Sequence, residues 1–203
     1  MDLRIGVLAS HGGSNMQAII DRIEAGELAG TVVLVISNNS RSGALERARR
    51  HELPYVHLSG KTHPEPGELD AAICDALTTA EANVVVLAGY MKKIGPRMLE
   101  AFRGRILNIH PALLPKHGGK GMYGIRPHES VLAAGDTESG ATVHAVDERY
   151  DHGPVLRQRK VPVCDGDTPE TLRDRVLAEE YVIYAEVLAD VAAGRIALPV
   201  AGA

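Results

Sequence analysis

The stretch LRIGVLASHGGSNMQAIIDRIEAGEL, residues 3–28, decides the fold of this chain. An apolar run over 3–10 ends at small residues, which is typical of a buried parallel strand. The residues that follow place four apolar side chains on one stripe of a helix over 15–28: Met16, Ile19, Ile20 and Ile23. Glycines in the turn at 10–15 let the backbone approach a ligand, and the free N–H groups at a helix start favour an anion. The segment therefore predicts a strand, a ligand-binding turn and a helix.

The same alternation continues through the first half of the chain. Apolar, β-branched runs predict further strands at 31–37, 54–59, 83–89 and 105–110. Helical patterns between them cover 42–52 and 66–82, with a short helical segment at 96–102. Five strands that alternate with helices and short connections are typical of a parallel sheet covered by helices.

The last third of the chain has a different character. A glycine-rich loop at 116–127 leads to a short helix at 128–135, and two strands are expected at 140–146 and 154–163. A long helix follows over 168–194, with Thr168 as N-cap and Pro169 in its first turn. Because the third position of this helix is Thr171 rather than glutamate or glutamine, no capping box is expected.

Together these patterns predict one α/β domain over residues 1–203. It is Rossmann-like, with a mainly parallel twisted sheet of about seven strands, helices on both faces and a long C-terminal helix. No internal repeat or linker interrupts it.

Composition narrows the class of protein. A net charge of -4 argues against a general binder of nucleic acid or anionic membrane, which would carry a basic face. We expect neither a secretory leader nor a membrane span, because no charged-then-apolar start and no run of 18 apolar residues occurs, so a cytoplasmic location is expected. Cys74 and Cys164 lack CxxC spacing and are interpreted as free thiols, buried or partly buried.

The turn SHGGSN, residues 10–15, has an unusual glycine spacing for a nucleotide site. It does not match GxGxxG, and the second strand ends in SNNSRSG without an acidic residue for a ribose hydroxyl. The chain also lacks GxxxxGKS and GxxxxGKT. A single phosphate on a small substrate fits better than a dinucleotide or a P-loop nucleotide. Taken alone, the turn is equally consistent with a tight β–α connection and a helix cap.

The stretch ILNIHPALLP, residues 106–115, places two polar side chains at the end of a buried strand. Side chains alternate faces along a strand, so Asn108 and His110 point to one side and Leu107 and Ile109 to the other. The carboxyl ends of parallel strands are where ligands gather. An amide donor and an imidazole there could stabilise an oxyanion and move a proton in acyl transfer. For an isolated Asn-x-His, however, a polar pair satisfied by loop backbone is the more common arrangement.

The stretch ATVHAVDERYDHGPVL, residues 141–156, supplies His144 and Asp151. A carboxylate beside His110 would favour the protonated imidazole and orient it. Asp151 alone reads as a turn residue, and His144 is either a partner in the site or a buried polar residue. No HExxH, HxH or Cys/His cluster occurs, so no metal site is expected, and no GxSxG elbow offers a serine nucleophile.

Four stretches and the final helix resemble the phosphoribosylglycinamide formyltransferase family, in order along nearly the whole chain. The stretches are GVLASHGGSNMQAI, VVVLAGYMKKIGP, ILNIHPALLPK and GATVHAVDERYDHGPVLRQRKVPV. The Asn-x-His…Asp set is shared with a wider group of formyltetrahydrofolate enzymes. The GSN turn is more discriminating, because in this family it holds the phosphate of the ribonucleotide.

The resemblance implies an activity. It is direct formyl transfer from 10-formyltetrahydrofolate to the amine of phosphoribosylglycinamide, in purine synthesis, without a metal. Residues 1–104 would form a phosphate-binding half and 105–203 a folate-binding and catalytic half. The partners would be these small molecules only, and the protein would be a monomer or homodimer.

The resemblance also assigns roles to residues at the matching positions. His110 would be the general acid at the formyl oxygen, Asn108 would hydrogen-bond the same oxygen, and Asp151 would raise the pKa of His110 and relay a proton. The substrate phosphate would bind Gly13, Ser14 and Asn15, and the glycinamide end would meet Glu180. The folate would bind a set of residues that also includes Asn108: Met91, Lys92, Lys93, Ile94 and His144.

Two departures and two alternatives accompany the resemblance. The loop 116–127 is several residues longer than the commoner family form, so its contacts do not carry over. The family often has an arginine that contacts the cofactor just before the helix at 66–82. Here only Pro66 lies near that place, and Lys61 or His63 could substitute for the arginine.

A formyltetrahydrofolate hydrolase would normally add an N-terminal regulatory domain and would not need the GSN turn. A non-catalytic folate- or nucleotide-binding module would have no reason to align an Asn-x-His with a distant carboxylate.

Overall fold

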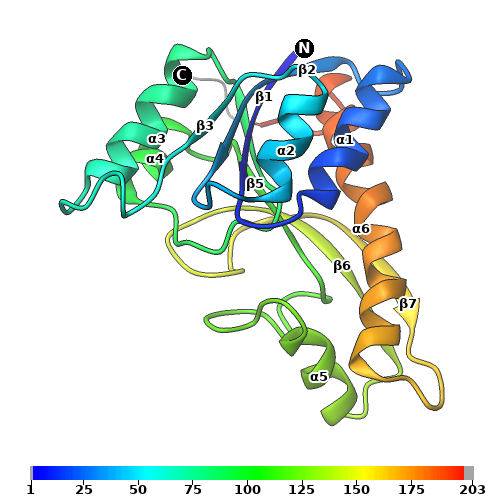
Figure 1. Cartoon of the computed structure of the whole chain (residues 1–203). Helices are drawn as coiled ribbons and strands as arrows, with labels where there is room; N and C mark the ends of the chain where they lie inside the picture. Colours follow the sequence, from blue (N-terminus) through cyan, green and yellow to red (C-terminus); the bar gives the residue numbers. More distant parts are fainter. Residues whose placement is uncertain (1, 199–203) are drawn as a thin grey trace.

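The seven strands form one sheet in the order β3-β2-β1-β4-β5-β6-β7 in a computed structural model, which describes residues 2–198 (Figure 1). The strands are β1 (Leu3–Ala9), β2 (Gly30–Ser37), β3 (Tyr55–His57), β4 (Val84–Leu87), β5 (Ile106–His110), β6 (Glu138–Ala145) and β7 (Val155–Pro162). The helices are α1 (Ser14–Glu24), α2 (Gly43–Arg50), α3 (Glu68–Thr79), α4 (Pro96–Ala101), α5 (Arg126–Ala133) and α6 (Pro169–Ala192).

The first five strands run parallel, and the last two are antiparallel. β1 pairs in parallel with β2 and β4, β2 with β3, and β4 with β5, whereas β6 pairs antiparallel with both β5 and β7. The predicted α/β class, the mainly parallel sheet and the long C-terminal helix are confirmed. The change of direction at β6 brings a new strand alongside the carboxyl end of β5.

Helices cover both faces of the sheet. Figure 1 shows α1, α2 and α6 on one side, with α3 and α4 on the other. Successive side chains of one strand enter different clusters, since Val84 and Val86 pack in the cluster with α1, α2 and α6, while Val85 and Leu87 pack in the cluster with α3 and α4. Burial on both faces explains why these strands read as continuous apolar runs.

Three sequence predictions are corrected by the structure. α1 ends at Glu24 rather than near 28, because the chain turns at Gly26 with a φ of 72°. α6 does have a capping box: Thr171 Oγ1 accepts from the Thr168 N–H at 2.9 Å, and the Thr168 hydroxyl accepts from the Thr171 N–H at 3.3 Å. The expectation was wrong because a threonine hydroxyl can accept as a carboxylate does. Cys164 is exposed, whereas Cys74 is buried.

Within residues 2–198, no helix is both long and apolar enough to cross a membrane.

Candidate active site

Two glycines, one in the turn between β1 and α1 and one at the start of α2, let these two segments lie in close contact. Gly13 is the N-cap of α1 with a φ of 70°, a left-handed conformation that favours glycine. A Cβ there would lie 2.9 Å from both Cα and Cβ of Ala44. On the other side, a Cβ on Gly43 would lie 3.0 Å from the carbonyl oxygen of Gly12. The turn therefore packs directly on the start of α2.

No side chain caps the N-terminus of α1. The first intrahelical bond at this end runs from the Gln17 N–H to the Gly13 carbonyl at 2.9 Å, so the N–H groups of the preceding residues have no partner within the helix. A helix start of this kind is suited to an anion. This geometry favours the phosphate interpretation of the turn over the simple helix cap.

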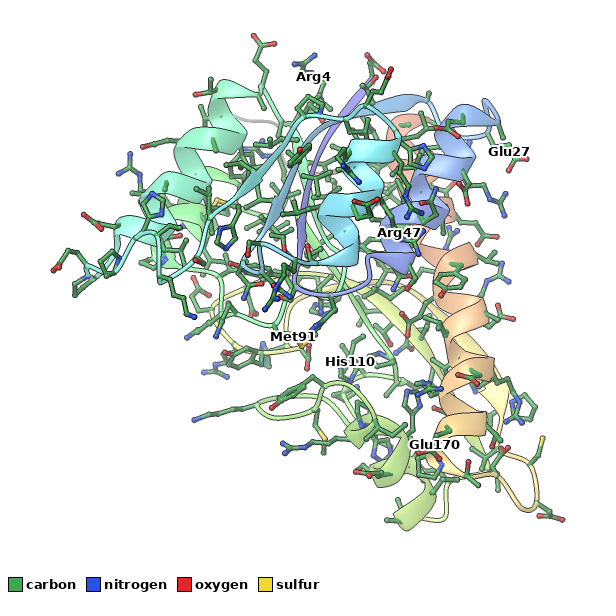
Figure 2. All side chains as sticks on the ribbon, viewed as in Figure 1. Arg4, Glu27, Arg47, Met91, His110 and Glu170 are labelled. Carbon is green, nitrogen blue, oxygen red and sulfur yellow. The ribbon has the colours of Figure 1, made fainter. Side chains whose placement is uncertain are left out.

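Arg47 of α2 holds the turn in place, and sequence reasoning missed it. Its Nε donates to the Gly12 carbonyl at 2.9 Å, and its Nη1 donates to Gln17 Oε1 at 2.9 Å (Figure 2). An arginine on the polar face of a helix carries no pattern that could have revealed this contact.

Asn15 and Glu180 meet beneath the turn. Asn15 Nδ2 donates to Glu180 Oε2 at 2.8 Å, and both side chains are buried. The other amide atom, Asn15 Oδ1, is buried without a hydrogen-bond partner. Burial raises the pKa of Glu180 to about 7, although the bond from Asn15 opposes this shift. The Asn15 side chain thus faces Glu180, which leaves its backbone N–H for a phosphate.

Asn108 and His144 form one hydrogen-bonded pair across β5 and β6. The antiparallel register places these two residues opposite each other, and Asn108 Nδ2 lies 3.1 Å from His144 Nε2. His144 Nδ1 lies 2.9 Å from the Ala145 carbonyl, which can only accept, so in the neutral ring Nδ1 carries the hydrogen and Nε2 accepts from the amide. One hydrogen of the Asn108 amide remains available to a ligand.

Asp151 lies between the two imidazoles. Its Oδ2 is 3.4 Å from His110 Nδ1, and its Oδ1 is 3.7 Å from His144 Nε2. The Gly119 N–H donates to Oδ2 at 2.9 Å, and Asp151 has a φ of 54°, which aspartate tolerates better than most residues. Figure 2 marks His110 at the end of β5, where this group gathers. The structure therefore brings together the side chains that the sequence placed in two separate segments.

The pKa of His110 is lowered from its ordinary value. Burial is the main cause, whereas the charge of Asp151 and the carbonyl of His117 act in the opposite direction. The predicted effect of Asp151 thus has the expected sign, but burial outweighs it. The pKa of Asp151 is lowered, because the neighbouring His144 and His110 imidazoles and the Gly119 N–H together outweigh burial.

The segment after β4 supplies three exposed side chains and one buried one. Met91, Lys92 and Lys93 are exposed, and the Met91 N–H donates to Ser10 Oγ at 2.8 Å, which ties this segment to the turn after β1. Ile94 packs in the apolar cluster with α3 and α4. Its side chain is therefore turned away from solvent, and only its backbone is placed to meet a ligand.

The loop 116–127 reaches the catalytic candidates directly. His110 Nε2 lies 2.9 Å from the carbonyl oxygen of His117, a residue that sequence reasoning did not single out.

The two predicted substitutes for the family arginine lie before α3. Lys61 is exposed, and His63 Nδ1 lies 2.9 Å from the neighbouring Thr62 Oγ1. The described residues contain no group of three or more His, Cys, Asp and Glu that could hold a metal ion.

Comparison with known proteins identifies close relatives. The family model described as formyl transferase matches residues 3–188. The chain is 43% identical to a chloroplastic phosphoribosylglycinamide formyltransferase of Arabidopsis thaliana over 95% of its own length and 66% of the plant protein. It is 38% identical to a phosphoribosylglycinamide formyltransferase of Haemophilus influenzae, over 96% of this chain and 90% of that protein. The chain thus spans slightly less than two thirds of the plant relative.

Solved structures agree with this likeness. The crystal structure of glycinamide ribonucleotide transformylase 1 from Symbiobacterium toebii has a TM-score of 0.90 and 42% identity, covering 97% of this chain and 91% of that one. A formyltetrahydrofolate deformylase from Pseudomonas syringae has a TM-score of 0.86, but at 25% identity and over only 64% of its chain.

Proposed function

This chain belongs to the formyl transferase family, and we propose that it is a phosphoribosylglycinamide formyltransferase of purine biosynthesis. It transfers the formyl group of 10-formyltetrahydrofolate to the amine of phosphoribosylglycinamide. Relatives that bear this name are 38–43% identical over nearly the whole chain. The observation that carries the proposal is the convergence of Asn108, His110, His144 and Asp151 at the carboxyl end of β5.

The chemistry needs no covalent enzyme intermediate. The neutral amine attacks the formyl carbon, and the negative charge that develops on the formyl oxygen faces the free N–H of Asn108 and the His110 ring. His110 acts as the general acid at this oxygen. As the tetrahedral species collapses, the formyl oxygen returns its proton to His110 and the carbonyl re-forms. N10 of the folate leaves with the proton that the amine lost, which reaches it through His110 and Asp151.

Asp151 works by its charge and by its position. It faces His110 Nδ1 at 3.4 Å, so it stabilises the imidazolium against the desolvation that lowers its pKa. The proton on Nδ1 is thereby shared within a buried pair, close to the reacting atoms. His144 holds the Asn108 amide in one orientation from the opposite strand.

The two substrates occupy different edges of this centre. The N–H groups of Gly13, Ser14 and Asn15 receive the phosphate, and Glu180 beneath them receives the glycinamide end. The folate lies along Met91, Lys92 and Lys93, with the Ile94 backbone beside them, and reaches the Asn108–His144 pair. On this proposal the phosphate-binding half is residues 1–104, the catalytic half is 105–203, and the two together are one domain.

An absorbance assay of formylfolate loss tests the proposal. Consumption that requires phosphoribosylglycinamide is the expected result. Consumption without it would indicate a hydrolase, and no consumption would indicate a binding module, so either result would overturn the proposed activity. His110→Ala should abolish most turnover, while Asp165→Asn, at an exposed position, serves as the control.

We also propose a cytoplasmic enzyme that is a monomer or a homodimer and that binds only small molecules. The net charge of -4 supports the absence of a nucleic-acid partner. Light scattering on the eluting protein separates the two oligomeric states, since the monomer has a mass of 21.7 kDa. Cell fractionation tests the location.

A further inference from the structure

The segment 117–119 touches both members of the His110–Asp151 pair. The His117 carbonyl accepts from His110 Nε2 at 2.9 Å, and the Gly119 N–H donates to Asp151 Oδ2 at 2.9 Å. Between them, a Cβ on Gly118 would lie 3.2 Å from the Cβ of Asp151. In Figure 2 the green loop that leads to α5 lies beneath His110. Any shift of these three residues would therefore disturb the pair from both sides.

The carbonyl of His117 decides which nitrogen of His110 is free. Because a carbonyl oxygen only accepts, His110 Nε2 must carry its hydrogen in the neutral ring. The second, exchangeable proton then binds at Nδ1, which faces Asp151 at 3.4 Å. Without this carbonyl, the neutral ring could carry its hydrogen on Nδ1, and the direction of proton transfer would no longer be defined.

The side chain of His117 is clamped on both edges of its ring. Nδ1 lies 2.8 Å from Ser130 Oγ on α5, and Nε2 lies 2.8 Å from Asp136 Oδ2. Bonds from Lys116 and from His117 hold the pKa of Asp136 below its usual value, so this carboxylate is ionised and accepts from Nε2–H. Nδ1 then accepts from the Ser130 hydroxyl.

Packing and hydrogen bonds together hold this residue. His117 has a φ of 54°, a region that few non-glycine residues adopt, histidine, asparagine and aspartate more often than the others. Its side chain is only 10% exposed and lies between Ser130 and Asp136. Because such a conformation persists where surrounding contacts enforce it, the two hydrogen bonds of the ring are the polar part of the contacts that hold this backbone.

We propose that His117 is a positioning residue, whose side chain, fixed by Ser130 and Asp136, holds its own carbonyl against His110 and so sets the hydrogen on Nε2 and the proton-transfer site on Nδ1. The inference rests on the proposed formyl transfer for its kinetic consequence. Its structural part concerns the free protein and can be tested without any substrate.

The first test measures the ring nitrogens of His110 by NMR in protein labelled with ¹⁵N-histidine, with His110→Gln to assign the signals. The titratable groups that face this ring are Asp151, His144, His117 and His128. In the wild type we expect hydrogen on Nε2 of the neutral ring. In His117→Ala we expect a mixture of the two forms and a lower pKa of His110, because the accepting carbonyl raises that pKa.

The second test is kinetic. His117→Ala should lower kcat roughly 10- to 100-fold, as displacement of a catalytic group by about 1 Å does, with KM for phosphoribosylglycinamide changed less than about 2-fold. The alkaline limb of the kcat profile should move to lower pH, since less His110 is protonated. His117→Asn, which tolerates positive φ and can accept from Ser130, should recover most of the loss. Asp165→Asn, at an exposed position, should leave both readouts unchanged.

The outcomes separate this inference from the proposed function. If His117→Ala leaves the His110 nitrogens as in the wild type, the inference is overturned whatever the activity. If kcat and thermal stability fall together and His117→Asn restores neither, the role is only structural, which also overturns it. Should His117→Ala fail to fold, Asp136→Asn keeps His117 and must shift the same nitrogens in the same direction. A wild type that shows the expected ring nitrogens but no formyl transfer refutes the proposed function alone.

Discussion

The proposed phosphate turn and the proposed catalytic group are built in opposite ways. The turn at 10–15 is made from neighbouring residues, shaped by Gly13 and held by the start of α2. The catalytic group joins Asn108, His110, His144 and Asp151 from two strands and a loop, and its geometry depends on the loop at 117–119. A short motif is enough to create an anion site, whereas a proton-transfer centre needs side chains that only long-range pairing can align.

The two regions also differ in where their backbone is unusual. In the turn, the left-handed conformation falls on a glycine, which adopts it at little cost. In the catalytic half, it falls on His117 and Asp151, both with a φ of 54°. Such conformations persist in non-glycine residues only where surrounding contacts enforce them, and both residues here contact His110.

Loss of the Asp151 charge should have the largest effect. Asp151→Asn keeps an oxygen for the Gly119 N–H but removes the anion that favours protonated His110. We expect kcat to fall about 10²- to 10⁴-fold, and the pKa of His110 to fall further below its ordinary value. Steady-state kinetics across pH measure both. Asp165→Asn, at an exposed position, is the control, and a kcat near that of the wild type in Asp151→Asn would remove the carboxylate from the mechanism.

The phosphate turn offers a matched pair of glycine substitutions. Gly13→Ala places a Cβ 2.9 Å from Ala44 and in a left-handed conformation, whereas a Cβ on Gly12 meets nothing within 4 Å. Moving backbone donors of a charged ligand by about 1 Å should raise KM for phosphoribosylglycinamide roughly 100-fold in Gly13→Ala, with kcat reduced less. Isothermal titration with the ribonucleotide gives the same difference as a binding constant. Equal behaviour of the two variants would mean that the turn does not bind the phosphate.

The buried carboxyl group of Glu180, which accepts from Asn15 in the turn, should make stability depend on pH. The pKa of Glu180 is about 7 in the folded protein and near 4.5 when unfolded, so folding is favoured by the protonated form. The free energy of unfolding should therefore be highest below pH 4.5 for this group and fall by as much as about 3 kcal/mol as the pH rises through 7. Glu180→Gln should remove that fall, as urea unfolding at pH 4.5 and pH 8 would show. The exposed Glu100→Gln should retain it.

The smallest effect concerns the contact of α6 with β4 and β5. Tyr184 of α6 is buried, and its hydroxyl lies 2.8 Å from the Leu107 carbonyl and 3.3 Å from the Leu87 carbonyl, which joins β4 to β5. Tyr184→Phe leaves these carbonyls without that donor and should cost about 1 to 2 kcal/mol in the free energy of unfolding. Tyr181→Phe, on the same helix but only half-buried, should cost close to nothing. If both variants unfold alike, the contact of α6 with β4 and β5 does not depend on this hydroxyl.

The sequence predicted much of this architecture because the strands repeat one local pattern. Each central strand is buried on both faces, so its apolar run is visible without knowledge of its neighbours. The ends of the elements were predicted less accurately. The capping box of α6 was missed, because the motif was expected only with glutamate or glutamine at the third position of the helix. The roles assigned to Asn108, His110 and Asp151 stay predictions. The structure places Asp151 Oδ2 3.4 Å from His110 Nδ1 and pairs Asn108 with His144.

The sequence by itself determined the class of fold, the order of its elements and the family, since periodicity and short motifs are properties of neighbouring residues. Only the tertiary structure decided that Asn15 meets Glu180, 165 positions away, that His144 lies opposite Asn108, and that His117 presents its carbonyl to His110. Each of these contacts depends on strand register or on a loop conformation. Those are settled by the packing of the whole chain, because a hydrogen bond between distant residues leaves no periodic trace in either segment.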